Sequence, residues 1–161
     1  MSAATNGLTL GFRADANVRI CKFTALVQST ANISTQSQQF AALPAGANAA
    51  GVLGVTIEHF VEPNYFVPQG TNPTTVTGTP PTLYDLQNRG LTLQVNGIAR
   101  CVAAGPINQG QLVNVADQYG RVKAVNEAAG TTVYPVGMAL HNVSNVNDVL
   151  QVGLNFAQTK V

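Results

Sequence analysis

The sequence predicts an all-β domain built from short antiparallel strands. Within residues 91–125, Leu91, Leu93 and Val95 alternate with polar residues, as they do in a strand that buries one face. Turn-forming sequences divide the rest of this stretch: Asn96-Gly97, Gly105-Pro106, Gln109-Gly110 and residues 117–120 (DQYG). We therefore expect a meander of strands over residues 91–95, 98–103, 111–115 and 121–125.

Length and composition predict one domain with few surface charges. The chain has 161 residues, of which 45% are hydrophobic, so it can form a sizeable core. Only 9% are charged, against about 25% in typical domains, and the net charge is +1. Such a surface has little repulsion to keep copies apart and lacks the basic stripe that nucleic-acid binding needs. This composition suits a component of an assembly and argues against a nucleic-acid partner.

Residues 1–17 are predicted to form an extended N-terminal arm, and residues 18–161 a single β domain. The arm is small and polar, with an apolar alternation at Leu8, Leu10 and Phe12, followed by Arg13. We interpret these four as contact residues on a partner; the alternative is a plain disordered tail. The segment has neither the basic nor the apolar region of a secretory signal, and no apolar run in the chain is long enough for a transmembrane helix.

The first half of the domain is expected to contain two strands. Residues 18–27 and 51–60 have strand-like apolar patterns, and Gly54 lets another backbone come close. Residues 28–39 are rich in Ser, Thr, Asn and Gln and predict a long turn. Residues 40–50 are expected to form a short helical turn that Pro44 and Gly46 break.

Residues 62–89 predict a long loop that makes contacts. Five prolines make it semi-rigid, and loops of this length are usually functional or disordered. Tyr65, Phe66 and Tyr84 can anchor it on a sister subunit or on another partner.

The chain is expected to close with strands over residues 133–142 and 149–156. A faint echo links AGANAAGVLGVTIEH to AAGTTVYPVGMALH: a turn of small residues, an apolar run around a glycine, and then a histidine. Two similar units of this kind can pack as a small closed barrel.

The sequence has no catalytic, cofactor-binding or metal-binding pattern, so we expect a protein that is not an enzyme. His59 and His141 do not have zinc-ligand spacing with Cys21 or Cys101, and no activated serine motif is present. Buried free thiols are favoured over a disulfide for the two cysteines. Asp117 is interpreted as a turn former, with Arg121 at the start of the next strand.

The order of these motifs resembles the capsid decoration (cement, or head-stabilising) proteins of tailed bacteriophages. The matching parts are the GVLGVT segment, Ile107-Gly110-Val113, Gly120-Arg121-Val122 and Pro135-Gly137-Ala139, with a looser match from Gly97 to Val102. The resemblance covers about residues 18–27 and 51–156, with 62–89 as an insertion. Each motif consists of turn glycines and core valines, so it is their order that carries the resemblance.

The resemblance implies a small antiparallel β-barrel or β-tulip-like domain that binds the outer surface of a phage head. There it would cement adjacent capsomers of the major capsid protein, often as a homotrimer, without a cofactor, a membrane or nucleic acid. Two rival functions stay open: a trimeric module of a tail or fibre, and a carbohydrate-binding β-domain that uses the aromatic residues of the long loop.

Overall fold

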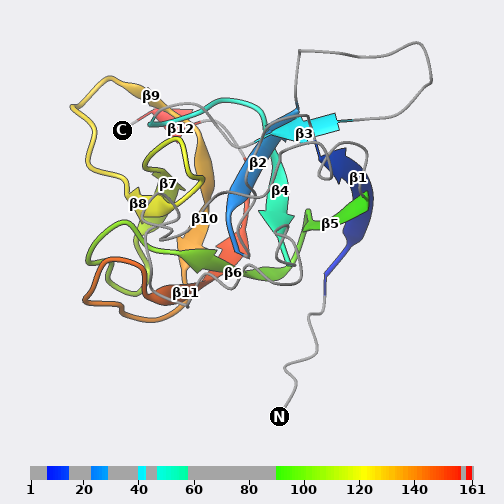
Figure 1. Ribbon diagram of the computed structural model, residues 1–161. Coiled ribbons are helices and arrows are strands. Elements are labelled where there is room, and N and C mark those ends of the chain that lie inside the picture. The colour runs from blue at the N-terminus through cyan, green and yellow to red at the C-terminus, as the bar shows by residue number, and fades with distance from the viewer. Residues whose placement is uncertain are drawn as a thin grey trace, which may run out of the picture.

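The computed structural model describes residues 7–14, 23–28, 40–42, 47–57, 90–156 and 159–160. These residues form twelve β-strands and contain no helix, which confirms the all-β class (Figure 1). The predicted loop at residues 62–89 lies outside the described part of the chain. Within that part, there is accordingly no helix that could cross a membrane.

The first sheet forms a closed ring of five strands. In ladder order they are β1 (Thr9–Ala14), β3 (Phe40–Ala42), β2 (Ala25–Gln28), β4 (Val52–Thr56) and β5 (Gly90–Gln94), and β5 pairs back with β1. The β1–β3 pair is parallel and the others are antiparallel. The helical turn expected from residue 40 is wrong for Phe40–Ala42, because pairing with β1 and β2 holds these residues extended.

The second sheet contains five strands from the C-terminal half of the chain. Its order is β6 (Ile98–Val102), β11 (Val149–Leu154), β10 (Pro135–Ala139), β7 (Leu112–Val115) and β8 (Val122–Ala124). Ala103, directly after β6, forms a parallel bridge with Val122 in β8, so this sheet also curls back on itself. A small separate ladder joins β9 (Thr132–Val133) to β12 (Thr159–Lys160).

The meander expected over residues 91–125 has the right strands but the wrong partners. Its first strand is β5, which belongs to the ring, and its second is β6, which pairs with β11. Only β7 and β8 form a hairpin. Alternation along a strand shows which side chains are buried, but it does not show which strand lies alongside.

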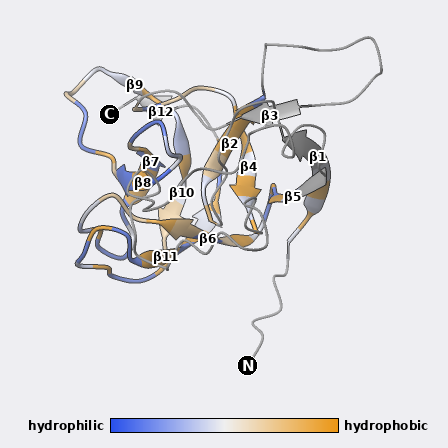
Figure 2. Ribbon diagram, in the orientation of Figure 1, coloured by the Kyte–Doolittle hydropathy of each residue, from blue (hydrophilic) through white to orange (hydrophobic). Residues whose placement is uncertain are grey.

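The main core lies on the inner face of the second sheet. It consists of small and branched side chains, among them Val113, Val115, Val136, Leu150 and Val152. The strands β2 and β4 of the ring are also coloured as apolar in Figure 2. Ala25 and Val55 extend this core into the ring. Cys101 is a buried free thiol, as expected, and burial raises its pKa to about 12; Cys21 is not among the described residues.

Residues 23–25 join the ring to the second sheet by backbone hydrogen bonds. Phe23 donates its N–H to Thr56 O in β4 (2.8 Å) and accepts one from Val102 in β6 (3.0 Å). Ala25 donates to Gly120 O in the β7–β8 turn (2.9 Å). Gly120 has a positive φ of 74°, and a Cβ there would collide with the Ala25 carbonyl oxygen.

The close contact between Ala25 and Gly120 predicts that alanine has different effects at two turn glycines. Gly110 also has a positive φ (81°), but a Cβ there would meet nothing. Both substitutions should cost about 1–2 kcal/mol for the left-handed backbone. Gly120→Ala should cost roughly 1–3 kcal/mol more, because the added carbon separates the sheets. Urea unfolding of the two variants measures the difference, and equal losses would contradict the role given to Gly120.

Candidate interaction surface

An apolar row crosses the outer face of the second sheet. Ile98 in β6 pairs in register with Gly153 in β11, Gly153 with Met138 in β10, and Met138 with Leu112 in β7. Residues directly opposite each other in a ladder project from the same face. The three large side chains are 49%, 46% and 39% exposed for Ile98, Met138 and Leu112 respectively. We call Ile98, Gly153, Met138 and Leu112 together the apolar row.

The row exists because these strands carry apolar side chains on both faces. Ala99, Val113 and Ala139 are the chain neighbours of the three exposed residues, and they point into the core. Core burial therefore explains the inward positions, but it gives no reason for apolar side chains at the outward ones. Single exposed apolar residues are common, whereas aligned ones on adjacent strands are typical of a contact surface.

Two glycines set the shape of the row. A Cβ on Gly137 would collide with the carbonyl oxygen of Gly153, so Gly137 allows β10 and β11 to lie at their observed spacing. A Cβ on Gly153 would meet only Leu140 Cδ2 at 3.7 Å and Met138 O at 3.9 Å, which are ordinary contacts. Gly153 is therefore a shallow notch in the row that a side chain could fill without disturbing the fold.

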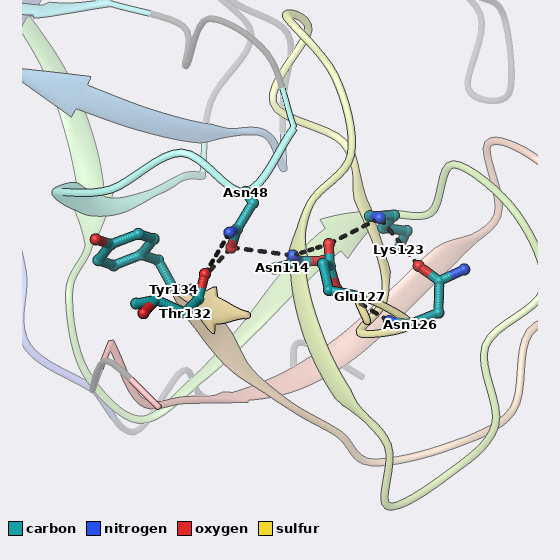
Figure 3. A network of polar contacts seen from close by, with 7 residues as sticks. All are labelled: Asn48, Asn114, Lys123, Asn126, Glu127, Thr132 and Tyr134. Carbon is teal, nitrogen blue, oxygen red and sulfur yellow. Dashed lines mark hydrogen bonds and ion pairs between the residues drawn. The ribbon is translucent and has the colours of Figure 1, made fainter. Parts of the chain in front are cut away.

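A polar network stabilises this sheet at its β7–β8 edge (Figure 3). Its centre is the buried Asn114 of β7, whose Nδ2 donates to Asn48 Oδ1 (3.2 Å) and to Glu127 Oε1 (2.8 Å). Asn48 also accepts from the backbone N–H of Tyr134 (2.8 Å) and donates to Thr132 O (2.9 Å). One asparagine side chain thus ties the turn before β4 to the segment that leads into β10.

The charged part of the network is a pair formed by Lys123 and Glu127. Lys123 Nζ lies 2.9 Å from Glu127 Oε1. Burial alone would raise the pKa of the Glu127 carboxyl, but hydrogen bonds from Asn114, Lys123 and nearby backbone amides outweigh it and lower the pKa to about 2. The carboxylate is therefore ionised at neutral pH and serves as a structural acceptor.

The other charged pair of the described residues confirms a turn. Asp117 Oδ2 lies 2.6 Å from Arg121 Nη2, and Asp117 Oδ1 accepts the Tyr119 N–H (3.0 Å). This geometry locks the β7–β8 turn, as the sequence predicted. Across the described ranges, no group of three or more His, Cys, Asp or Glu residues is placed to hold a metal ion.

The predicted contact residues fall partly within the described chain. Leu8 and Leu10 are 59% and 44% exposed, as a contact role requires. The backbone of Phe12 and Arg13 lies in β1, but their side chains are not described; Tyr65, Phe66 and Tyr84 are outside the described residues. Their contact roles stay predictions.

The N-terminal arm differs in one respect from the expected free extension. Residues 9–14 form β1, which pairs with β5 over five positions from Thr9–Gln94 to Arg13–Gly90. This part of the predicted arm is therefore a strand of the domain, because its backbone closes the ring. The domain boundary at residue 17 itself stays a prediction.

Sequence reasoning did not find the apolar row. Each member looks unremarkable alone, because Ile98 begins a strand of mixed pattern and Met138 follows a buried glycine. A possible signal was the large apolar residue at the outward phase of three separate strands. Recognising it as a row requires the register between β6, β11, β10 and β7.

Comparison with known proteins identifies no family. No protein-family model matches the chain, and no curated protein matches its sequence. Among solved structures, the chain is similar to the head fiber gp8.5 N base of bacteriophage phi29, with a TM-score of 0.47 and 9% identity over 96% of this chain and 98% of that one. A likeness this weak supports no conclusion about the function of this protein.

The network predicts how stability depends on pH. The folded-state pKa of Glu127 is about 2 and its ordinary value is 4.5. The stabilisation is therefore present above the ordinary value and is lost as the pH falls toward 2. Urea unfolding from about pH 6 to about pH 2.5 should show a smaller loss of stability for Glu127→Gln than for the wild type.

A matched variant separates the charge pair from the rest of the network. Lys123→Gln removes one of the donors that lower the pKa of Glu127, so its acid-induced loss should fall between the other two. Identical pH dependence in all three proteins would show that Glu127 is not held as described.

Proposed function

We propose that the protein is a structural component of a bacteriophage head that binds the outer surface of the capsid and cements adjacent capsomers. The apolar row is the observation that supports this proposal. Its members are in register across four strands and its three large side chains are exposed, so they offer a partner an apolar strip. The order of the sequence motifs supports the same class of protein.

The low charge of the chain also favours a permanent place in an assembly. With 9% charged residues, contacts are mostly apolar and amide-rich and depend less on salt than contacts between highly charged surfaces do. A shell presents many symmetric copies of each joint, so a contact of modest area at each joint stiffens the whole particle. The proposed role is non-catalytic, and the partner is the major capsid protein.

The exposed leucines before and within β1 provide a second contact in this proposal. Leu8 precedes the strand, and its carbonyl accepts the Val95 N–H (2.9 Å), which fixes where the N-terminal segment leaves the ring. In the proposal, Leu8 and Leu10 contact a neighbouring capsomer. The domain and its arm would then contact two subunits, which is the geometry that a cement needs.

Capsid binding by row variants tests the proposal. Met138→Asp places a charge in the middle of the row at an exposed position, so it should leave the fold intact and weaken binding to expanded empty capsids by tenfold or more, on the order of a contact hot spot. Gly153→Gln should act similarly by filling the notch. Co-sedimentation with purified capsids measures both.

Val146→Asp is the matched control. Val146 is 53% exposed but lies in the turn before β11, away from the row. It should bind as the wild type does. Wild-type protein that does not sediment with capsids would overturn the proposal, and equal binding by Met138→Asp would remove the row from it.

The proposed oligomer is a homotrimer, and light scattering on the same samples tests it. We expect trimers for the wild type and for Met138→Asp, because in the proposal the row faces the shell. A variant that dissociates to monomers would assign the row to the contact between subunits. Trimers or rods that never bind capsids would favour a tail or fibre module.

A further inference from the structure

Arg100 differs from the other cations whose side chains the structure describes. Arg121 pairs with Asp117 (2.6 Å) and Lys123 pairs with Glu127 (2.9 Å). Arg100 is exposed on the same sheet, and it has no carboxylate partner among the described residues. Its guanidinium lies over the ring of Phe23, 5.7 Å from the centroid.

Arg100 stands at the rim of the apolar row. It follows Ile98 by two residues in β6, so both project from the outer face of the sheet. Its ladder partner is Gln151 in β11, whose neighbour on that face is Gly153 of the row. An apolar centre with an arginine at its edge is the usual anatomy of a protein contact.

The contact with Phe23 orders the arginine without using its hydrogen-bond donors. Phe23 is itself fixed by backbone hydrogen bonds to Thr56 and Val102. Stacking on a ring leaves the N–H groups at the edge of the guanidinium plane free for a planar acceptor. A carboxylate fits this fork with two parallel hydrogen bonds.

The acidic side chains that the structure describes are a poor source of that carboxylate. The described acidic side chains are already engaged: Asp117 by Arg121, Glu127 by Lys123 and Asn114, and Asp148 by the backbone N–H groups of Ser144 and Asn145. In the proposed function this face meets the capsid protein, so charge complementarity assigns the carboxylate to an acidic residue beside an apolar patch of that protein.

We propose that Arg100 pairs with an aspartate or glutamate of the capsid protein at the edge of the apolar row. This inference rests on the proposed function and deepens it, because it names the chemistry of the partner surface. The row supplies contact area, and the ion pair fixes the orientation in which the sheet meets the shell.

Salt dependence of capsid binding tests the pair. From about 50 mM to about 500 mM salt, screening weakens a rim ion pair but not apolar contact. Wild-type affinity should fall over this range, whereas Arg100→Gln should bind about tenfold more weakly at low salt and show a flatter salt dependence. Arg100→Glu should bind more weakly still, because it places two negative groups together.

Two further variants serve as controls. Lys123→Gln removes the same charge from the outer face of the same sheet, but from a cation that is already paired, so its salt dependence should match that of the wild type. Phe23→Leu keeps the charge of Arg100 and removes the ring beneath it, so it should lose less affinity than Arg100→Gln. Thermal unfolding verifies that each variant is folded.

The possible results separate this inference from the proposed function. If the wild type binds capsids and Arg100→Gln binds equally well with the same salt dependence, the ion pair is excluded and the capsid role stands. If Lys123→Gln flattens the salt dependence as much as Arg100→Gln does, general charge rather than a specific pair explains it. If the wild type binds at no salt concentration, the capsid role itself fails.

Discussion

The architecture depends on one short backbone joint, because residues 23–25 hydrogen-bond to strands of both sheets. Phe23 reaches β4 on one side and β6 on the other, and Ala25 reaches the β7–β8 turn at Gly120. Buried backbone groups must find partners, so these bonds fix how the ring sits on the second sheet. Ala25 and Val55 then complete the core across the joint. The same joint holds Phe23 under Arg100, which links the core to the proposed contact face.

Two features hold the outer face of the second sheet in place. In the middle of the sheet, Gly137 lets β10 and β11 approach closely, which brings Met138 and Gly153 into register. At the β7–β8 edge, the network around Asn114 holds this hairpin against the turn before β4. Asn114 Oδ1 is buried and has no hydrogen-bond partner among the described residues, so this network costs some stability of its own. A rigid sheet face suits a protein that binds by apolar contact, because little order has to be gained on binding.

The sequence predicted the elements better than their arrangement. Alternation and turn glycines located β4 to β8 and β10 to β11, since burial pattern and turn chemistry are local properties. Pairing is not local: β5 and β6 are separated by only three residues, 95–97, yet they belong to different sheets. The apolar row was missed for the same reason, because Ile98 and Met138 are 40 positions apart in the sequence and meet only through Gly153. Of the contact residues that were predicted, the structure describes the side chains of Leu8 and Leu10, and both are exposed.

The central claim is that the outer face of the second sheet is the surface that meets a phage shell. A cryo-electron-microscopy reconstruction of expanded empty capsids incubated with the protein tests it most directly. The account predicts density on the outside of the shell at joints between capsomers, with the face that carries Ile98, Met138 and Leu112 against the capsid protein. Bare capsids, or bound protein whose apolar row points into solvent, would contradict it.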